Sequence, residues 1–204
     1  GQSNVAEKDA SNFALNVLKE LNGLIVERYN KHFQGLDNNL IEEKGATEVP
    51  VKNMIDLSNA EVSMYPADDE NIPSRLENLI DGDFNTNWNP MYTTSYLIYE
   101  LTLDLKEGKK INGLRFVQAN YNDNEDAISM APEMIKIYVS NDRVSWKIAT
   151  YLEESIIGKT KGEINDINFT NEIKNNSYQY VQVRINAGPF GKYFGSRVAE
   201  INLY

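Results

Sequence analysis

The chain contains no cysteine and only one histidine, His32, among its 204 residues. Without cysteine there is no disulfide, no zinc–thiolate site and no cysteine nucleophile. His32 has no companion histidine or cysteine with which to hold a metal, and its place in a segment of helical spacing favours a surface position over a role as catalytic base. Cysteine chemistry is therefore excluded, and histidine chemistry is disfavoured.

Long apolar runs and positive charge are also scarce. No stretch of about 18 apolar residues occurs, so the sequence predicts no membrane insertion. The 30 acidic residues outnumber the 20 basic ones and give a net charge of −10. Nucleic acids and anionic membrane surfaces bind basic patches, so this balance disfavours both as partners. A hydrophobic fraction of 41% nevertheless predicts a folded chain with a full core.

The N-terminal part has helical spacing. Within residues 10–33 one stripe is apolar, and it consists of Phe13, Ala14, Val17, Leu18, Leu21, Leu24, Ile25 and Tyr29. Such a stripe packs either on its own domain or on a partner domain, and the sequence leaves both open. Residues 35–52 are rich in Gly, Asn and Glu, which indicates a linker. We therefore expect an N-terminal helical extension and linker at residues 1–50 and a separate domain at residues 51–204.

From residue 54 onwards, the apolar residues recur at every second position. The alternation is clearest in residues 99–105, 135–139 and 181–185. Alternation of this kind marks strands with one face on a core. We expect about eight such strands, separated by loops rather than by long helices, which is typical of a β-sandwich. The predicted fold is therefore mainly β, with an N-terminal α-helical extension.

The most distinctive loop is rich in oxygen ligands. Four such side chains fall within six residues: Asp81, Asp83, Asn85 and Thr86. Calcium prefers oxygen ligands, although Asp and Asn beside a glycine also form ordinary turns by bonding their own backbone. An EF-hand is excluded, because its sixth and twelfth positions would be Thr86 and Tyr92 instead of Gly and Glu. A calcium ion here would need further ligands from another loop.

Five motifs follow one another in a specific order. The first is the loop itself, in which a hydrophobic pair precedes Asp-Gly-Asp, Thr and Trp at residues 79–88. The others are LDL with INGLRF at 103–116, YVSND with a Trp at 138–146, YVQVR at 180–184 and VAEINLY at 198–204. This series resembles the discoidin family, the coagulation factor five/eight type C domains with their galactose-binding-like fold and their relatives among bacterial carbohydrate-binding modules. The resemblance covers about residues 54–204.

The resemblance implies a jelly-roll sandwich with a structural calcium ion between the two ends of the domain. The implied ligands are Asn78, Asp81, Asp83, Thr86, Ala199 and Glu200. Asn78 and Ala199 would supply backbone carbonyls, and the other residues would supply side-chain oxygens, which together form a plausible calcium shell. The alternative is that Glu200 forms a salt bridge with a surface Lys or Arg.

The carbohydrate-binding relatives hold their ligands on loops at one end of the sandwich. The corresponding loops here are residues 89–92, 118–126 and 188–195. Aromatic rings stack on the C–H face of a sugar, while fixed polar groups bind its hydroxyls. The implied glycan-binding residues are Tyr92, Arg115, Asn120, Tyr121, Phe190, Tyr193 and Phe194. Arg115 either reaches the ligand or lies in mid-strand, and Asn89 stands where galactose-binding relatives often have His.

The leading prediction is a non-catalytic carbohydrate-binding domain of a secreted or cell-surface bacterial protein, with a glycan as ligand and calcium as structural ion. The alternative is a protein-interaction or structural module that packs on a partner subunit or domain. Glycoside hydrolysis requires two carboxyl groups that face each other across a cleft. No motif singles out such a pair, so we do not expect an enzyme.

Overall fold

The computed structural model describes residues 52–68, 74–90, 93–95, 97–119, 130–190 and 193–204. The helical extension predicted at residues 1–50 lies outside the described residues. Within them, the chain folds into antiparallel sheets with two short helices, η2 (Leu76–Leu79) and α3 (Asn171–Lys174). Neither of these four-residue helices is long enough to span a bilayer. The mainly β fold predicted from the sequence is confirmed for these parts of the chain.

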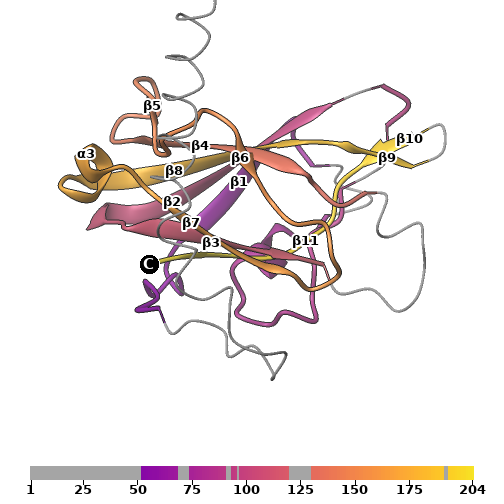
Figure 1. Cartoon of the computed structure of the whole chain (residues 1–204), viewed down its shortest axis with the longest axis horizontal. Helices are drawn as coiled ribbons and strands as arrows, with labels where there is room; N and C mark the ends of the chain where they lie inside the picture. Colours follow the sequence, from indigo (N-terminus) through magenta and orange to yellow (C-terminus); the bar gives the residue numbers. More distant parts are fainter. Residues whose placement is uncertain (1–51, 69–73, 91–92, 96, 120–129, 191–192) are drawn as a thin grey trace, which may run out of the picture. The chain divides into compact units, whose positions relative to one another are not determined.

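The larger sheet has six strands in the order β1-β2-β8-β4-β5, and β6 also pairs with β4 (Figure 1). Its strands are β1 (Glu61–Tyr65), β2 (Ile98–Lys110), β4 (Met134–Ser140), β5 (Lys147–Ile148), β6 (Ser155–Ile156) and β8 (Ser177–Asn186). The smaller sheet has the order β11-β3-β7 and consists of β11 (Val198–Leu203), β3 (Gly113–Gln118) and β7 (Ile164–Asn168). A separate hairpin pairs β9 (Gly188–Phe190) with β10 (Tyr193–Gly195).

The core lies between the two sheets. In β2, Leu101 and Leu103 are fully buried and alternate with the half-buried Thr102, which explains the period of two in the sequence. Phe116 on β3 and Ile201 on β11 close the core from the smaller sheet, and both are fully buried. Burial of each such side chain stabilises the fold by about 1.5–3 kcal/mol relative to leaving the side chain exposed.

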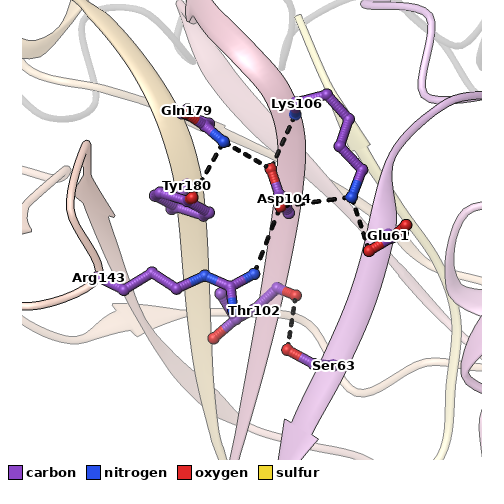
Figure 2. Close-up of polar contacts among 8 residues, drawn as sticks. All are labelled: Glu61, Ser63, Thr102, Asp104, Lys106, Arg143, Gln179 and Tyr180. Carbon is purple, nitrogen blue, oxygen red and sulfur yellow. Dashed lines mark hydrogen bonds and ion pairs between the residues drawn. The ribbon is translucent and has the colours of Figure 1, made fainter.

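A polar network covers one end of the outer face of the larger sheet (Figure 2). Asp104 on β2 lies at its centre, where its carboxylate accepts from the Lys106 backbone N–H at 2.8 Å and from Gln179 Nε2 at 3.0 Å. The Arg143 guanidinium lies 3.5 Å from the same carboxylate and 4.6 Å from the centre of the Tyr180 ring. The network therefore joins β2, β8 and the loop that follows β4.

Candidate functional site

The loop after η2 meets the last strand of the domain. Gly82 N–H donates to Glu200 Oε2 on β11 at 3.3 Å, and the Asp81 and Glu200 carboxyls also interact with each other. Thr86 Oγ1 lies 2.8 Å from Asp81 Oδ2. Gly82 has φ of 78°, a left-handed conformation that glycine adopts without strain. The structure thus brings Asp81, Thr86 and Glu200 together from distant parts of the sequence.

Glu200 is fully buried, which is unusual for a carboxylate. The pKa of Glu200 is raised to about 8, chiefly by burial and also by the nearby Asp81, while hydrogen bonds from Gly82 and Asn202 act in the opposite direction. None of the ion pairs among the described residues involves Glu200, so the alternative of a surface salt bridge finds no support there. A buried carboxyl in contact with an exposed one is the kind of group that a cation stabilises.

The other implied calcium ligands are arranged differently. The Asp83 carboxylate accepts from the backbone N–H and side-chain amide of Asn85, both at 2.9 Å, and these bonds lower the pKa of Asp83. No group of three or more Asp, Glu or His side chains that could hold a metal occurs among the described residues. The Asp83 side chain thus forms the ordinary turn considered above, while its backbone carbonyl lies 2.9 Å from Thr86 Oγ1.

The two residues expected to contribute carbonyls lie on either side of this loop. Asn78 belongs to η2, and its side-chain amide donates to the carbonyl of Asn87 at 2.9 Å. Ala199 is the extra residue of a β-bulge in β11, between Val198 and Glu200. A bulged residue is left out of the regular ladder, which frees its backbone for other contacts.

A groove of about 770 Å³ adjoins the same loop. Its lining includes apolar side chains of Leu57, Val62, Leu76 and Ile80, together with Asp81 and Glu200. The groove does not coincide with the loops implied for glycan binding. It gives the Asp81–Glu200 pair an open side toward solvent.

The residues that flank the first of the loops implied for glycan binding pair with residues in and beside the third. Trp88 pairs with Val198, and Thr93 pairs with Phe194, as two isolated antiparallel bridges. Trp88 N–H donates to the Val198 carbonyl at 2.8 Å, and Thr93 and Phe194 exchange hydrogen bonds of 2.9 and 2.7 Å. Trp88 and Thr93 therefore lie directly beside Val198 and Phe194. We call this region the loop end.

The structure places the implied glycan-binding residues unequally. Tyr92, Asn120 and Tyr121 lie outside the described residues, as do the side chains of Phe190 and Tyr193, whose backbones form β9 and β10. Phe194 is half-buried and packs against the core. The third loop thus contains a short antiparallel pair of strands, β9 and β10.

Arg115 occupies the mid-strand position considered above. It lies on β3 with only 6% of its surface exposed. Its Nε and Nη2 groups donate to the two oxygens of Asp166 on β7 at 2.7 and 2.8 Å. A glycan at the loop end would have to break this paired contact to engage the guanidinium.

Sequence reasoning missed one charged residue at the loop end. Arg197 Nε–H donates to Asn89 Oδ1 at 3.1 Å. The two residues are 108 positions apart, and neither belongs to a motif that indicates the contact. Only the pairing of Trp88 with Val198 brings them together.

Comparison with known proteins identifies relatives of this fold. The sequence profile of the F5/8 type C domain matches residues 38–198, which is most of the chain. No curated protein matches the sequence. Among solved structures, CBM32-3 from a family 31 glycoside hydrolase of Clostridium perfringens is 20% identical with a TM-score of 0.57, and the match covers 74% of this chain and 94% of that one.

Two further similar structures were solved with bound sugars. CpGH89CBM32-5 from Clostridium perfringens, in complex with GalNAc-β-1,3-galactose, is 16% identical with a TM-score of 0.55 and coverage of 74% of this chain and 99% of that chain. The family 32 module of NanJ from C. perfringens, in complex with galactose, is 16% identical with a TM-score of 0.54 and coverage of 74% and 96%. At these identities the similarity establishes the fold.

Proposed function

Because the chain belongs to the F5/8 type C domain family, we propose that it is a non-catalytic carbohydrate-binding domain that holds a glycan at its loop end. The observation that carries the proposal is the pairing of Trp88 with Val198 and of Thr93 with Phe194. These two bridges support a common site for the first and third implied binding loops. Similar folds that were solved with sugars, such as the one bound to galactose, support the same ligand class.

The proposed glycan contacts come from the first and third loops and from the segment after β3. They are Tyr92, Asn120, Tyr121, Phe190, Tyr193 and Phe194. We leave Arg115 out, because its guanidinium is engaged with Asp166. A shallow site that buries few ligand atoms binds weakly, with a dissociation constant on the order of millimolar to high micromolar.

We also propose a structural calcium ion at the Asp81 loop. The fit rests on the buried Glu200 carboxyl, which faces Asp81 without a basic partner among the described ion pairs. Asp81, Thr86 and Glu200 would hold the ion with side-chain oxygens, and Asn78, Asp83 and Ala199 would add backbone carbonyls. When bound, the ion supplies the positive charge that this carboxyl pair lacks.

A protein-interaction role is the second candidate, and exposed apolar side chains favour it. Six of them fall between β4 and β6: Met134, Val144, Ile148, Tyr151, Leu152 and Ile156. Exposed apolar patches mark interaction surfaces when they are contiguous. In this second role, the apolar side chains between β4 and β6 would contact a partner subunit or a neighbouring domain of a larger secreted or cell-surface protein.

A glycan array probed in calcium tests the leading proposal. We expect binding to a defined glycan, and we expect the triple variant Phe190→Ala, Tyr193→Ala, Phe194→Ala to lose it, since stacking rings supply much of the contact area. Tyr151→Ala is the matched control, because this ring is 63% exposed on the edge formed by β5 and β6. Thermal unfolding of both variants verifies folding, and unchanged affinity of the folded triple variant would refute the proposed site.

A further inference from the structure

The groove beside the Asp81 loop lies at an open side of the sandwich. Its described lining comes from residues 55–58, the start of β1, η2 with the loop after it, and β11. β1 ends the strand order of the larger sheet, β11 ends that of the smaller sheet, and η2 contacts both strands. The volume of about 770 Å³ falls within the range of about 300–1,000 Å³ that is typical of ligand sites.

The floor of the groove is apolar. Five of its lining residues pack against the core and are only half-buried: Ile55, Ala60, Val62, Leu76 and Ile80. Apolar surface that stays accessible in a groove favours a ligand that removes it from water. The floor therefore suits apolar side chains better than the hydroxyl groups of a sugar.

The charged side chains of the groove are all acidic. Its described lining contains Asp56, Glu61, Glu77, Asp81 and Glu200, and no Lys, Arg or His. Asp81 and Glu200 belong to the proposed ion site, so the charge left to a ligand comes from three exposed carboxylates, Asp56, Glu61 and Glu77. Lys106 pairs with Glu61 at 2.6 Å from outside this lining. An acidic rim of this kind favours cationic ligands and repels anionic ones.

The first strand of the domain offers backbone groups beside the groove. β1 pairs with β2 on one side, from Glu61 opposite Asp104 to Tyr65 opposite Glu100, and no described strand pairs with its other side. Alternate residues of such an edge strand direct their N–H and C=O groups away from the sheet. An extended peptide can pair with these groups while its side chains enter the adjacent groove.

From the apolar floor, the acidic rim and the free edge of β1, we propose that the groove binds an extended peptide segment of a partner protein in which apolar residues alternate with Lys or Arg. The apolar side chains cover the floor, the cationic side chains reach the rim, and the peptide backbone pairs with the start of β1. This site goes beyond glycan binding and does not depend on it, because the groove shares no described residue with the bridges of the loop end.

Titration calorimetry of the full chain in calcium tests the proposal with synthetic peptides. The probe is the heptapeptide KIKVKIK with an acetylated N-terminus and an amidated C-terminus. Acetylation of its four lysines removes the charge and keeps the apolar residues, whereas KSKTKSK keeps the charge and removes the apolar residues. We expect the probe to bind about tenfold more tightly than either derivative.

A charge-neutralised rim should weaken the complex. We expect the triple variant Asp56→Asn, Glu61→Gln, Glu77→Gln to bind the probe about tenfold more weakly. The triple variant Glu133→Gln, Glu153→Gln, Glu172→Gln is the matched control, because it removes the same charge from exposed carboxylates that each pair with a lysine outside the groove. This control should bind the probe as the wild-type chain does.

Several outcomes would overturn the proposal. They are no binding at about 1 mM probe, equal affinity for the lysine-acetylated peptide, and unchanged affinity of the folded rim variant. Binding of n-hexylammonium as tightly as the probe would overturn the peptide as ligand, since this small cation cannot pair with a strand. The glycan array tests the loop end separately, so a failed peptide titration leaves the carbohydrate-binding proposal standing.

Discussion

At the scale of single residues, the side chain of Asp142 organises the turn that follows β4. Its Oδ1 accepts from Val144 N–H at 2.8 Å and from Ser145 N–H at 2.7 Å. These bonds, with one from the Ser140 hydroxyl, hold the pKa of Asp142 far below its ordinary value. Because the pKa is lower in the folded state than in the unfolded state, the ionised carboxylate stabilises the fold. This contribution is complete above the unfolded pKa of about 3.9 and is lost as the pH falls toward the folded pKa.

We therefore expect Asp142→Ala to lower the free energy of unfolding at pH 7 and the deficit to shrink in strong acid. Urea unfolding at pH 7 and at about pH 2.5 measures both. Asp142→Asn is the control, because its amide oxygen still accepts from the backbone and only the charge is lost. A deficit of equal size at both pH values would mean that the ionised form carries none of the effect.

Individual side-chain orientations were the least predictable feature. The motif around Asp81 predicted that this loop and Glu200 lie together, and in the structure Gly82 N–H donates to Glu200 Oε2. The sequence left open whether the Asp83 carboxylate binds an ion or bonds the backbone of its own turn, because the same residues suit both, and in the structure it accepts from Asn85. The Arg197–Asn89 contact was beyond prediction for another reason, since it depends on a bridge between segments that share no local pattern.

At the scale of elements, periodicity predicted the long strands and missed three of the short ones. β2, β4 and β8 alternate over many residues and were recognised from that alternation. β6 has two residues, and β9 and β10 have three each, so none repeats the alternation often enough to be recognised from it. In the structure β6 pairs with β4, and β9 and β10 pair with each other.

The proposed calcium ion links two elements, the Asp81 loop and β11. Without the ion, the raised pKa of Glu200, about 8 against an ordinary 4.5, means that the protonated form stabilises the fold. This contribution is complete below the unfolded pKa and is lost as pH rises through the folded pKa. In chelator, we expect the stability of the wild-type chain to fall between about pH 5 and pH 8, by a few kcal/mol at most.

Calcium should reverse this trend. The ion binds the ionised carboxyl pair, so its stabilising effect grows with pH and reaches about 2.7 kcal/mol at 100 times its dissociation constant. Thermal unfolding at pH 5.5 and pH 8, in calcium and in chelator, measures the effect. Glu200→Gln should flatten the pH dependence in chelator and remove most of the calcium effect. Identical melting curves in calcium and chelator at pH 8 would contradict the proposed ion site.

At the scale of the whole molecule, the sandwich contains its own core. The buried cluster runs from Leu57 to Leu203, and it joins residues of both sheets. The family match begins at residue 38, so a chain without residues 1–37 keeps the entire matched region and lacks the segment predicted to be helical. The fate of this shortened chain separates the two candidate functions.

We expect the shortened chain to unfold cooperatively, to remain monodisperse and to bind the same glycan with an affinity within about twofold, because both bridges of the loop end lie within the part that is kept. Light scattering and calorimetry against the full chain measure this. If the shortened chain keeps its glycan affinity, the carbohydrate site needs nothing from the first 37 residues. If it folds but no longer binds the glycan, the N-terminal segment contributes to glycan binding. If it self-associates, the exposed apolar side chains between β4 and β6 are the expected contact, and the protein-interaction proposal gains the stronger support.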